Sequence, residues 1–394
     1  NLVIAGGGIS AGAVSLSGTS PITLTGGSFT AASLVLNAGS QLNLSNSAAT
    51  VSGNLDITDG SLSAGSMSVT GTMAANISTG TKTISTALGG TNSFSKSGAG
   101  ELVLSGANSY SGQTGVAAGT LTTGASEVLS DSATLKIDNF ATFKLGGNET
   151  VGGLNAAFGS FINLQSNTLT AGGNNTSFTN GATITGTGAL VKNGTGQMYF
   201  NNKTNTFSGG FVLNSGEVAF TSSGDAASGV ITNTCFGTGT VRLNGGSFGS
   251  SASSSGRSLH NSVILNGNIQ FGQTAWSAST TNLNGGTPNL TVTTTGGGTT
   301  TLASDSTINT IGSVQWDQPI SGNYRITKTG TGSLALSNNL LFLRGSNNIA
   351  GITVVSGILG YKNRNALGTG ILILKDGVVL AQESSINNSQ IGRA

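Results

Sequence analysis

The chain has 394 residues, of which 64 are glycine and 7% are charged, with a formal net charge of +2. Average soluble proteins hold about 25% charged residues, so this composition argues against an ordinary mixed α/β enzyme. The near-neutral charge also offers no strong attraction to a nucleic-acid backbone. Intrinsic disorder is disfavoured, because disordered chains are poor in aliphatic residues and rich in charge.

The apolar residues occur in short bursts that alternate with polar residues. Examples in chain order are the segments 22–24, 34–36, 102–104 and 371–374, and turn-forming residues such as Gly26 and Gly27 separate the bursts. Abundant Gly, Ser, Thr and Asn oppose helix formation almost everywhere. The pattern therefore predicts short β-strands joined by turns.

The bursts recur with a period near 20 residues. The segments 13–16, 33–36 and 54–57 have similar patterns, and so do the surroundings of Leu24 and Leu44. A unit this short buries too little core to be stable alone, so neighbouring units must stack on one another. The period predicts a β-solenoid. We expect its asparagines to form hydrogen-bonded ladders at equivalent corners.

A longer motif, K-x-G-x-G-x-apolar-x-apolar, appears three times along the chain. The first two copies continue alike, since the segment 108–112 is matched by 205–209, whereas the segment 340–344 interrupts the third copy. The motif lysines and glycines are Lys96, Gly98, Gly100, Lys192, Gly194, Gly196, Lys328, Gly330 and Gly332. We interpret these residues as structural.

These motifs resemble the autotransporter-associated β-strand repeat of Gram-negative passenger regions, and residues 96–121 follow that pattern almost throughout. The resemblance implies an all-β, right-handed parallel β-helix of about 16–20 coils. It also implies export across the bacterial envelope to the cell surface or beyond. We expect one continuous solenoid with three parts: a regular segment 1–90, a segment 91–325 that holds the repeats 96–121 and 192–220, and a basic segment 326–394 with the third repeat.

Three features bear on processing and redox chemistry. The chain starts at Asn1 without an initiator methionine or a signal segment, so we expect a mature or excised piece of a longer precursor. No apolar run reaches the roughly 18–20 residues that span a bilayer. The single cysteine, Cys235, cannot form an internal disulfide and is predicted to be a small buried side chain.

Residues that could support catalysis are few. The close acidic pairs are Asp56 with Asp59 and Glu127 with Asp131, and His260 is the single histidine that could centre a Ser-His-Asp site. Asp59 precedes Gly60 as a turn residue, and its odd offset sends Asp56 to the other face of a strand. We predict no enzyme, no cofactor and no metal site.

Aromatic residues offer a second hypothesis, a sugar-stacking platform. Its members would be Trp276, Trp316, Tyr110, Tyr199 and Tyr324. Packing in the core or at corners is the favoured interpretation of these side chains.

The leading functional prediction is a non-enzymatic extracellular structural protein. As a β-helical rod it would serve as a surface stalk or adhesin, or as a subunit of a self-assembling filament or sheath. Its partners would be copies of itself end to end and cell-surface or matrix polysaccharide. The expected assembly residues are Leu2, Val3, Ile4, Ile386 and Ile391. The alternatives are a polysaccharide lyase or hydrolase, or a carbohydrate-binding module, and a groove that gathers carboxylates or exposed aromatic residues would favour either.

Overall fold

A computed structural model describes residues 2–44, 48–250, 257–271, 290–330, 340–362, 364–382 and 392–393. The chain divides into two compact units, unit 1 over Asn1–Gly188 and unit 2 over Ala189–Ala394, and each is described by itself. Together they hold about 17 turns of a parallel β-solenoid. The predicted all-β solenoid is confirmed, and so is the predicted number of coils. Among the described residues the single helical element is the short 3-10 helix η1 (Arg364–Leu367).

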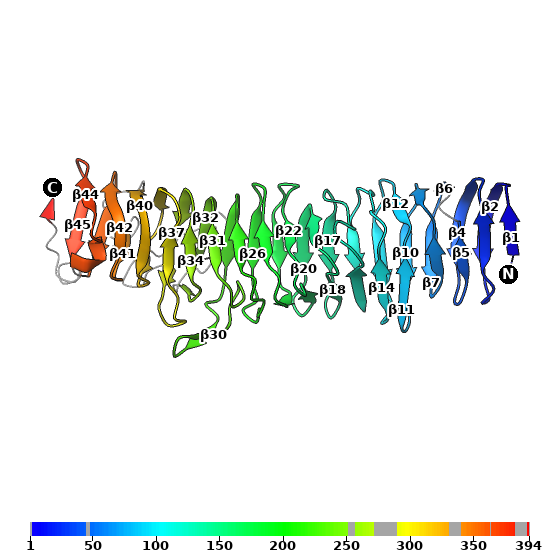
Figure 1. Ribbon diagram of the computed structural model, residues 1–394, viewed down its shortest axis with the longest axis horizontal. Helices are drawn as coiled ribbons and strands as arrows, with labels where there is room; N and C mark the ends of the chain where they lie inside the picture. The colour runs from blue at the N-terminus through cyan, green and yellow to red at the C-terminus, as the bar shows by residue number, and fades with distance from the viewer. Residues whose placement is uncertain are drawn as a thin grey trace. The chain divides into compact units, whose positions relative to one another are not determined.

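Unit 1 contains a sheet of ten parallel strands, one strand from each successive turn (Figure 1). These strands are β1 (Leu2–Ala5), β3 (Ile22–Thr25), β5 (Gln41–Asn43), β8 (Ser61–Ser63), β11 (Thr81–Ile84), β14 (Glu101–Leu104), β16 (Thr120–Thr123), β18 (Thr142–Lys144), β21 (Phe161–Asn163) and β24 (Thr183–Thr185).

The remaining strands of unit 1 stack as parallel ladders on the other sides of each turn. They are β2 (Ile9–Leu16), β4 (Phe29–Leu36), β6 (Ala48–Val51), β7 (Leu55–Thr58), β9 (Ser66–Val69), β10 (Met73–Asn76), β12 (Ala87–Gly89), β13 (Phe94–Ser97), β15 (Thr114–Val116), β17 (Thr134–Ile137), β19 (Glu149–Val151), β20 (Gly153–Ala156), β22 (Leu169–Ala171) and β23 (Phe178–Asn180). Hydrogen bonds between neighbouring turns commonly join residues 20 to 22 apart in the sequence, which agrees with the predicted period.

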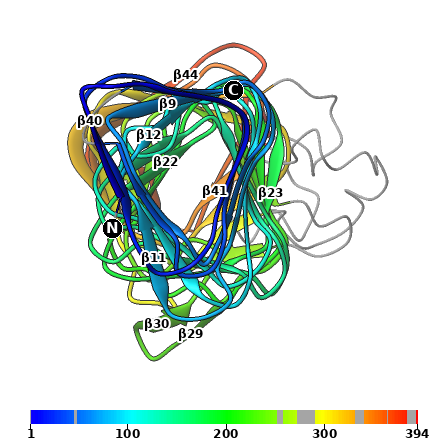
Figure 2. The same cartoon turned by 90° about the vertical axis from the view of Figure 1, so that its right-hand side faces the viewer.

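The core of unit 1 consists of columns of apolar side chains from successive turns. In one column the parallel register places Leu102 beside Leu121, Leu121 beside Phe143, and Phe143 beside Ile162. All four side chains are fully buried. Strand alternation turns every second residue inward, and burial of these apolar side chains stabilises one turn on the next. Figure 2 looks along these turns, drawn from blue to green.

Unit 2 repeats this architecture. Its main parallel strands are β25 (Leu190–Lys192), β26 (Gln197–Phe200), β27 (Phe211–Leu213), β28 (Glu217–Phe220), β31 (Val241–Leu243), β32 (Gly246–Ser250), β34 (Val263–Leu265), β35 (Ile269–Phe271), β37 (Thr300–Leu302), β38 (Ser306–Thr310), β40 (Ile320–Thr329), β42 (Asn348–Val354) and β44 (Ile371–Leu374). A second sheet contains β33 (Arg257–Leu259), β36 (Leu290–Val292), β39 (Val314–Trp316), β41 (Leu340–Leu343), β43 (Ile358–Tyr361), β45 (Val379–Gln382) and β46 (Gly392–Arg393), of which the last pair is antiparallel.

Aromatic rings fill much of the core of unit 2. Phe236 lies at the centre, with its ring centroid 5.1–5.2 Å from those of Phe200, Phe211, Phe220 and Phe248. The stack continues through Phe271 to Trp316. Most of these pairs are edge-to-face or tilted, which are the arrangements that aromatic quadrupoles favour.

One antiparallel hairpin departs from the solenoid of unit 2. Strands β29 (Asp225–Ala227) and β30 (Val230–Asn233) pair with each other across a tight turn and project from the neighbouring turns (Figures 1 and 2). The solenoid strands on either side still pair in parallel, Phe211 with Val241 and Glu217 with Ser247. The hairpin is therefore an insertion that leaves the strand register intact.

Candidate functional site

The motif lysine of the first long repeat is buried, and backbone oxygen atoms surround its ammonium group. Lys96 lies on β13 and is fully buried. Its Nζ donates hydrogen bonds to the carbonyl oxygens of Ser97 at 3.0 Å, Gly98 at 2.6 Å and Ala118 at 2.9 Å. Since Ala118 belongs to the next turn, the lysine joins two successive turns at a corner.

The two motif glycines beside Lys96 are required by close packing. Gly98 has φ of +77°, and a Cβ atom there would lie 2.2 Å from the Ile77 carbonyl oxygen. A Cβ atom at Gly100 would lie 2.7 Å from the Ile77 side chain. Glycine is the residue that combines a left-handed backbone with such close approach.

The second and third copies repeat this arrangement in unit 2. The Nζ of Lys192 donates to the carbonyl oxygens of Asn193, of Gly194 at 2.9 Å and of Ser215 at 3.5 Å. The Nζ of Lys328 donates to Thr329 at 2.6 Å and Ser356 at 3.4 Å.

The motif glycines of these two copies are also closely packed. Gly194 has φ of +70°, and Gly196 is buried. A Cβ atom at Gly330 would lie 2.6 Å from the Thr310 carbonyl oxygen. Gly332 lies outside the described residues.

Burial lowers the pKa of Lys96, Lys192 and Lys328 to about 8. The carbonyl oxygens act in the opposite direction, because they accept hydrogen bonds from the charged form. The arrangement gives each lysine the role of a cross-link between turns.

Asparagines form a ladder at one corner of unit 2. The side-chain amide of Asn214 donates to that of Asn193 at 2.8 Å, Asn244 donates to Asn214 at 2.7 Å, and Asn266 donates to Asn244 at 3.1 Å. Each amide inside the ladder donates to one neighbour and accepts from the other. The structure thus contains the predicted asparagine ladder.

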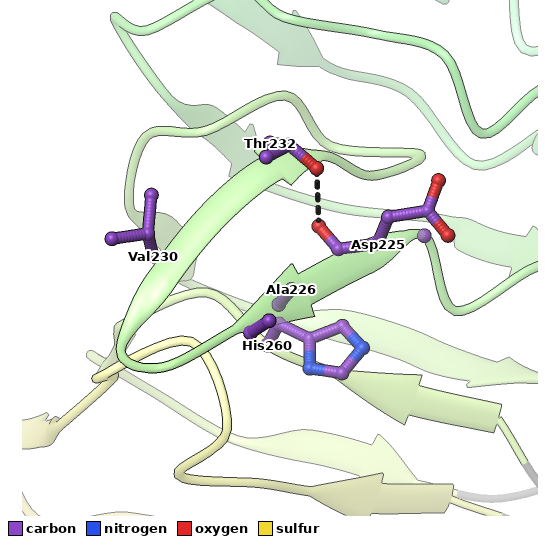
Figure 3. Close-up of a pocket in the computed structure, with 7 residues that line it drawn as sticks. Asp225, Ala226, Val230, Thr232 and His260 are labelled. Carbon is purple, nitrogen blue, oxygen red and sulfur yellow. Dashed lines mark hydrogen bonds between the residues drawn. The ribbon is translucent and has the colours of Figure 1, made fainter.

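A small pocket lies between the projecting hairpin and His260 (Figure 3). It has a volume of about 300 Å³ and is lined by Gly224, Asp225, Ala226, Ala227, Val230, Thr232 and His260. The Asp225 carboxylate pairs with Lys203 at 3.1 Å, and the Thr232 hydroxyl donates to the Asp225 backbone oxygen at 3.0 Å.

His260 is buried beneath this pocket, and its Nδ1 atom has no hydrogen-bond partner among the residues that the structure describes. Burial lowers the pKa of His260, while the Asp225 carboxylate acts to raise it. Among the described residues, none of those that line this pocket is a serine or a cysteine.

The structure separates the two acidic residues of the first pair. Asp59 has φ of +50° and accepts two hydrogen bonds from Ser78, which lower the pKa of Asp59. Asp56 lies on β7, and its side chain is half-buried. Asp59 therefore acts as a turn residue, as predicted.

The second acidic pair lies near a carboxylate that the sequence analysis did not single out. The fully buried Glu149 accepts hydrogen bonds from the backbone N–H groups of Val128 and Leu129, both at 3.0 Å. Burial raises the pKa of Glu149 to about 8, and the charges of Glu127 and Asp131 act in the same direction. Alternation along β19 was the available signal, since Glu149 lies two residues from the inward Val151.

The predicted aromatic residues do not gather into a platform in the described part of the chain. Tyr110 and Trp316 are fully buried, Tyr199 is half-buried and Tyr324 is exposed, and Trp276 lies outside the described residues. Three phenylalanines of unit 1 are exposed instead, and the sequence analysis did not identify them: Phe140, Phe158 and Phe161.

Two other predictions concern single residues and the ends of the chain. Cys235 is buried, its thiol donates to the Ser222 carbonyl oxygen at 3.1 Å, and burial raises its pKa to about 12. Of the expected assembly residues, Leu2, Val3 and Ile4 lie on β1, which pairs with β3. Ile386 and Ile391 lie outside the described residues.

Comparisons with known proteins agree with this architecture. A family described as the passenger-associated-transport-repeat matches residues 94–122 and 190–220, which include the first two buried lysines. An adhesin, the BmaC autotransporter of Brucella suis biovar 1 (strain 1330), is 37% identical over 138 residues, or 32% of this chain. The match spans 4% of the adhesin's own length. No solved structure matches. No helix in the described part of the chain is long and apolar enough to cross a membrane.

Proposed function

We propose that this chain, an autotransporter passenger-like parallel β-helix, is exported to the surface of a Gram-negative bacterium and acts there as part of a non-enzymatic adhesin. The observation that carries the proposal is the 37% identity to a stretch of an autotransporter adhesin. The two matched transport repeats support the same conclusion.

The structure of each unit suits a protein that holds surface features in place for contact with a target. Backbone ladders join each turn to the next, and the buried lysines and the asparagine ladder add cross-links at particular turns, so surface features are held at fixed positions along each unit. Two such features are the hairpin of unit 2 and the exposed phenylalanines of unit 1. Their work would be to contact a target surface.

The test is attachment. The chain would be displayed on a non-adherent bacterial host through an unrelated surface anchor, and attachment to epithelial cells and to matrix-coated plates would be counted. We expect at least a tenfold increase over the same host that displays an unrelated β-solenoid of equal length. Equal attachment by the two hosts would overturn the proposal.

The filament and enzyme alternatives stay predictions, and each has its own experiment. Cryo-electron microscopy of the purified chain over a concentration series tests end-to-end assembly, which predicts filaments that the variants Val3→Lys and Ile4→Lys disrupt. Cleavage of acidic polysaccharides that is lost on Glu127→Gln or Asp131→Asn would support the enzyme.

A further inference from the structure

Three exposed phenylalanines gather at one corner of unit 1, which we name the aromatic corner. Phe140, Phe158 and Phe161 are 79%, 69% and 44% exposed. A corner made of three large apolar side chains is unusual on a surface built mainly from Ser, Thr, Asn and Gly. Exposed aromatic clusters on soluble proteins mark interaction sites.

The three residues belong to two neighbouring turns. The backbone N–H of Phe140 donates to the Gly159 carbonyl oxygen at 3.2 Å. Phe158 directly precedes this glycine in the sequence, and Phe161 pairs with Thr142 of the other turn. Since the two turns are stacked in parallel, Phe140, between β17 and β18, and Phe158, between β20 and β21, lie in equivalent corners, and Phe161 begins β21 directly after the second corner.

The backbone at Phe140 is a second, independent observation. Its φ is +62°, in the left-handed region that bulky residues rarely adopt. The turns on either side have glycine at this corner, Gly119 with φ of +65° and Gly159 with φ of +82°. Folding alone would favour glycine at position 140. A strained, exposed aromatic residue there points to a role in binding.

Phe161 also departs from its neighbours. Its register partners on the preceding and following turns are Thr142 and Thr183. Threonine and phenylalanine both suit strand positions, and the neighbouring turns show that this outward position does not require an aromatic ring.

The surroundings of the aromatic corner are polar but carry little free charge. Asn139 and Asn155 are exposed beside it, and the nearest acid, Asp138, pairs with Lys136 at 2.9 Å. Over the whole of unit 1, four lysines stand against seven acidic residues, which gives a net charge of −3.

These features limit the kinds of ligand that can bind at the aromatic corner. A negative unit does not suit a surface of anionic lipids. A stable dimer uses about 20–30 residues on each side, whereas three apolar side chains make up this corner. A neutral saccharide has apolar C–H faces that stack on aromatic rings and hydroxyl groups that exchange hydrogen bonds with amides.

We propose that the aromatic corner binds a neutral saccharide, with Phe140, Phe158 and Phe161 stacking on sugar rings and Asn139 and Asn155 bonding to hydroxyl groups. This inference rests on the proposed function, for which it names a ligand class.

The residues at equivalent positions of the neighbouring turns indicate which substitutions should be made at the aromatic corner. Phe140→Gly and Phe161→Thr install the residues that adjacent turns carry at these positions, and Phe158→Ser removes the third ring. Val103→Thr is the matched control, because Val103 is a half-buried, outward apolar residue of unit 1 and its register partners on the neighbouring turns are Thr83 and Thr122.

Binding of the purified chain to dextran, mannan and galactomannan would be measured by affinity electrophoresis, with hyaluronate and phosphatidylglycerol vesicles as anionic comparisons. We expect wild type and Val103→Thr to bind at least one neutral polysaccharide and the triple variant to bind at least tenfold more weakly. The thermal midpoint of the triple variant should equal or exceed that of wild type, because Phe140→Gly relieves the backbone strain.

The inference would be overturned by no binding of wild type to any of the neutral polysaccharides, by equal binding of the triple variant, or by binding to the vesicles alone. A triple variant that alters only self-association in sedimentation velocity would identify a second copy as the occupant and would also overturn it. If saccharide binding fails while the displayed chain still promotes cell attachment, the ligand is wrong and the adhesin function stands.

Discussion

Units 1 and 2 build the same solenoid with different side chains inside. Column positions of unit 1 are mainly aliphatic, as in the series that contains Leu102, Leu121 and Ile162. Unit 2 fills much of its interior with aromatic rings, namely Phe200, Phe211, Phe220, Phe236, Phe248, Phe271 and Trp316. On the surface the contrast is reversed, since the exposed phenylalanines among the described residues all belong to unit 1.

The difference teaches that the backbone ladder sets this fold and that the core residues need only fill the interior with apolar volume. Aliphatic and aromatic columns satisfy the same parallel register. The location of a phenylalanine is therefore informative in each unit: inside unit 2 it supplies volume, and at the corner of unit 1 it is not needed for folding.

The largest loss of stability is expected from a substitution in the aromatic core of unit 2. Phe236→Ala should lower the free energy of unfolding by about 3–5 kcal/mol. It should exceed the loss from Phe143→Ala in unit 1, because Phe236 contacts four rings and each aromatic pair contributes about 0.5–1.5 kcal/mol beyond area burial. Urea unfolding with hydrogen exchange would assign each loss to its unit. Equal losses would show that the rings of unit 2 act only as volume.

The next contrast is in pH dependence. Glu149 of unit 1 has a folded-state pKa of about 8 against an ordinary value of 4.5. The folded state therefore binds more protons than the unfolded state between these values, so the stability of unit 1 should fall as pH rises from 5 to 8, by on the order of a few kcal/mol.

Hydrogen-exchange protection of β16–β20 at a series of pH values would measure this effect. Glu149→Gln keeps the side-chain shape without the charge and should flatten the pH dependence. An unchanged slope in this variant would show that another group is responsible.

Replacement of the buried lysines should have intermediate effects. Lys96→Met should lower the free energy of unfolding by about 1–3 kcal/mol, because the carbonyl oxygens of Gly98 and Ala118 would lose the Lys96 donor, whereas that of Ser97 would keep the Ile77 N–H. Lys328→Met should have a smaller effect, since the Nζ of Lys328 donates two hydrogen bonds within the described part of the chain, one of them 3.4 Å long.

Urea midpoints of these two variants would be compared with that of the surface control Lys136→Met. Stabilisation by Lys96→Met would mean that desolvation of the ammonium group outweighs its hydrogen bonds.

The smallest effect belongs to the asparagine ladder of unit 2. Asn214→Ala removes one donated and one accepted hydrogen bond at an exposed corner, so we expect a loss of about 0.5–1 kcal/mol. Asn155→Ala, at an exposed position of unit 1 outside the ladder, is the control. A loss in unit 2 no larger than in this control would show that the ladder adds no stability.

Periodicity carried most of the correct predictions. The spacing near 20 residues predicted a solenoid, and the family resemblance carried by the lysine motif implied that its strands are parallel. The buried Lys96 and Lys192 explain why the motif recurs. Residues that recur at one place in every turn are the ones that stacking constrains, so they leave a pattern in the sequence.

The residues that sequence analysis missed are those that occur once. Glu149 binds backbone N–H groups of the preceding turn, and no repeat marks that contact. Phe140 is exposed because its corner has a left-handed backbone. A strand pattern does not reveal the conformation of a corner. The predicted sugar-stacking platform therefore contained tryptophan and tyrosine residues and none of the phenylalanines.

The hairpin of unit 2 has a consequence for how such a chain can change over evolution. The insertion between β28 and β31 leaves the pairs Phe211 with Val241 and Glu217 with Ser247 in register. The register of these strands is therefore independent of the length of the chain between them. The tip itself contacts another part of unit 2, since the backbone N–H of Gly229 donates to the Thr295 carbonyl oxygen at 3.1 Å. A natural variant with a longer tip would keep the parallel strand pairs and would lose this contact.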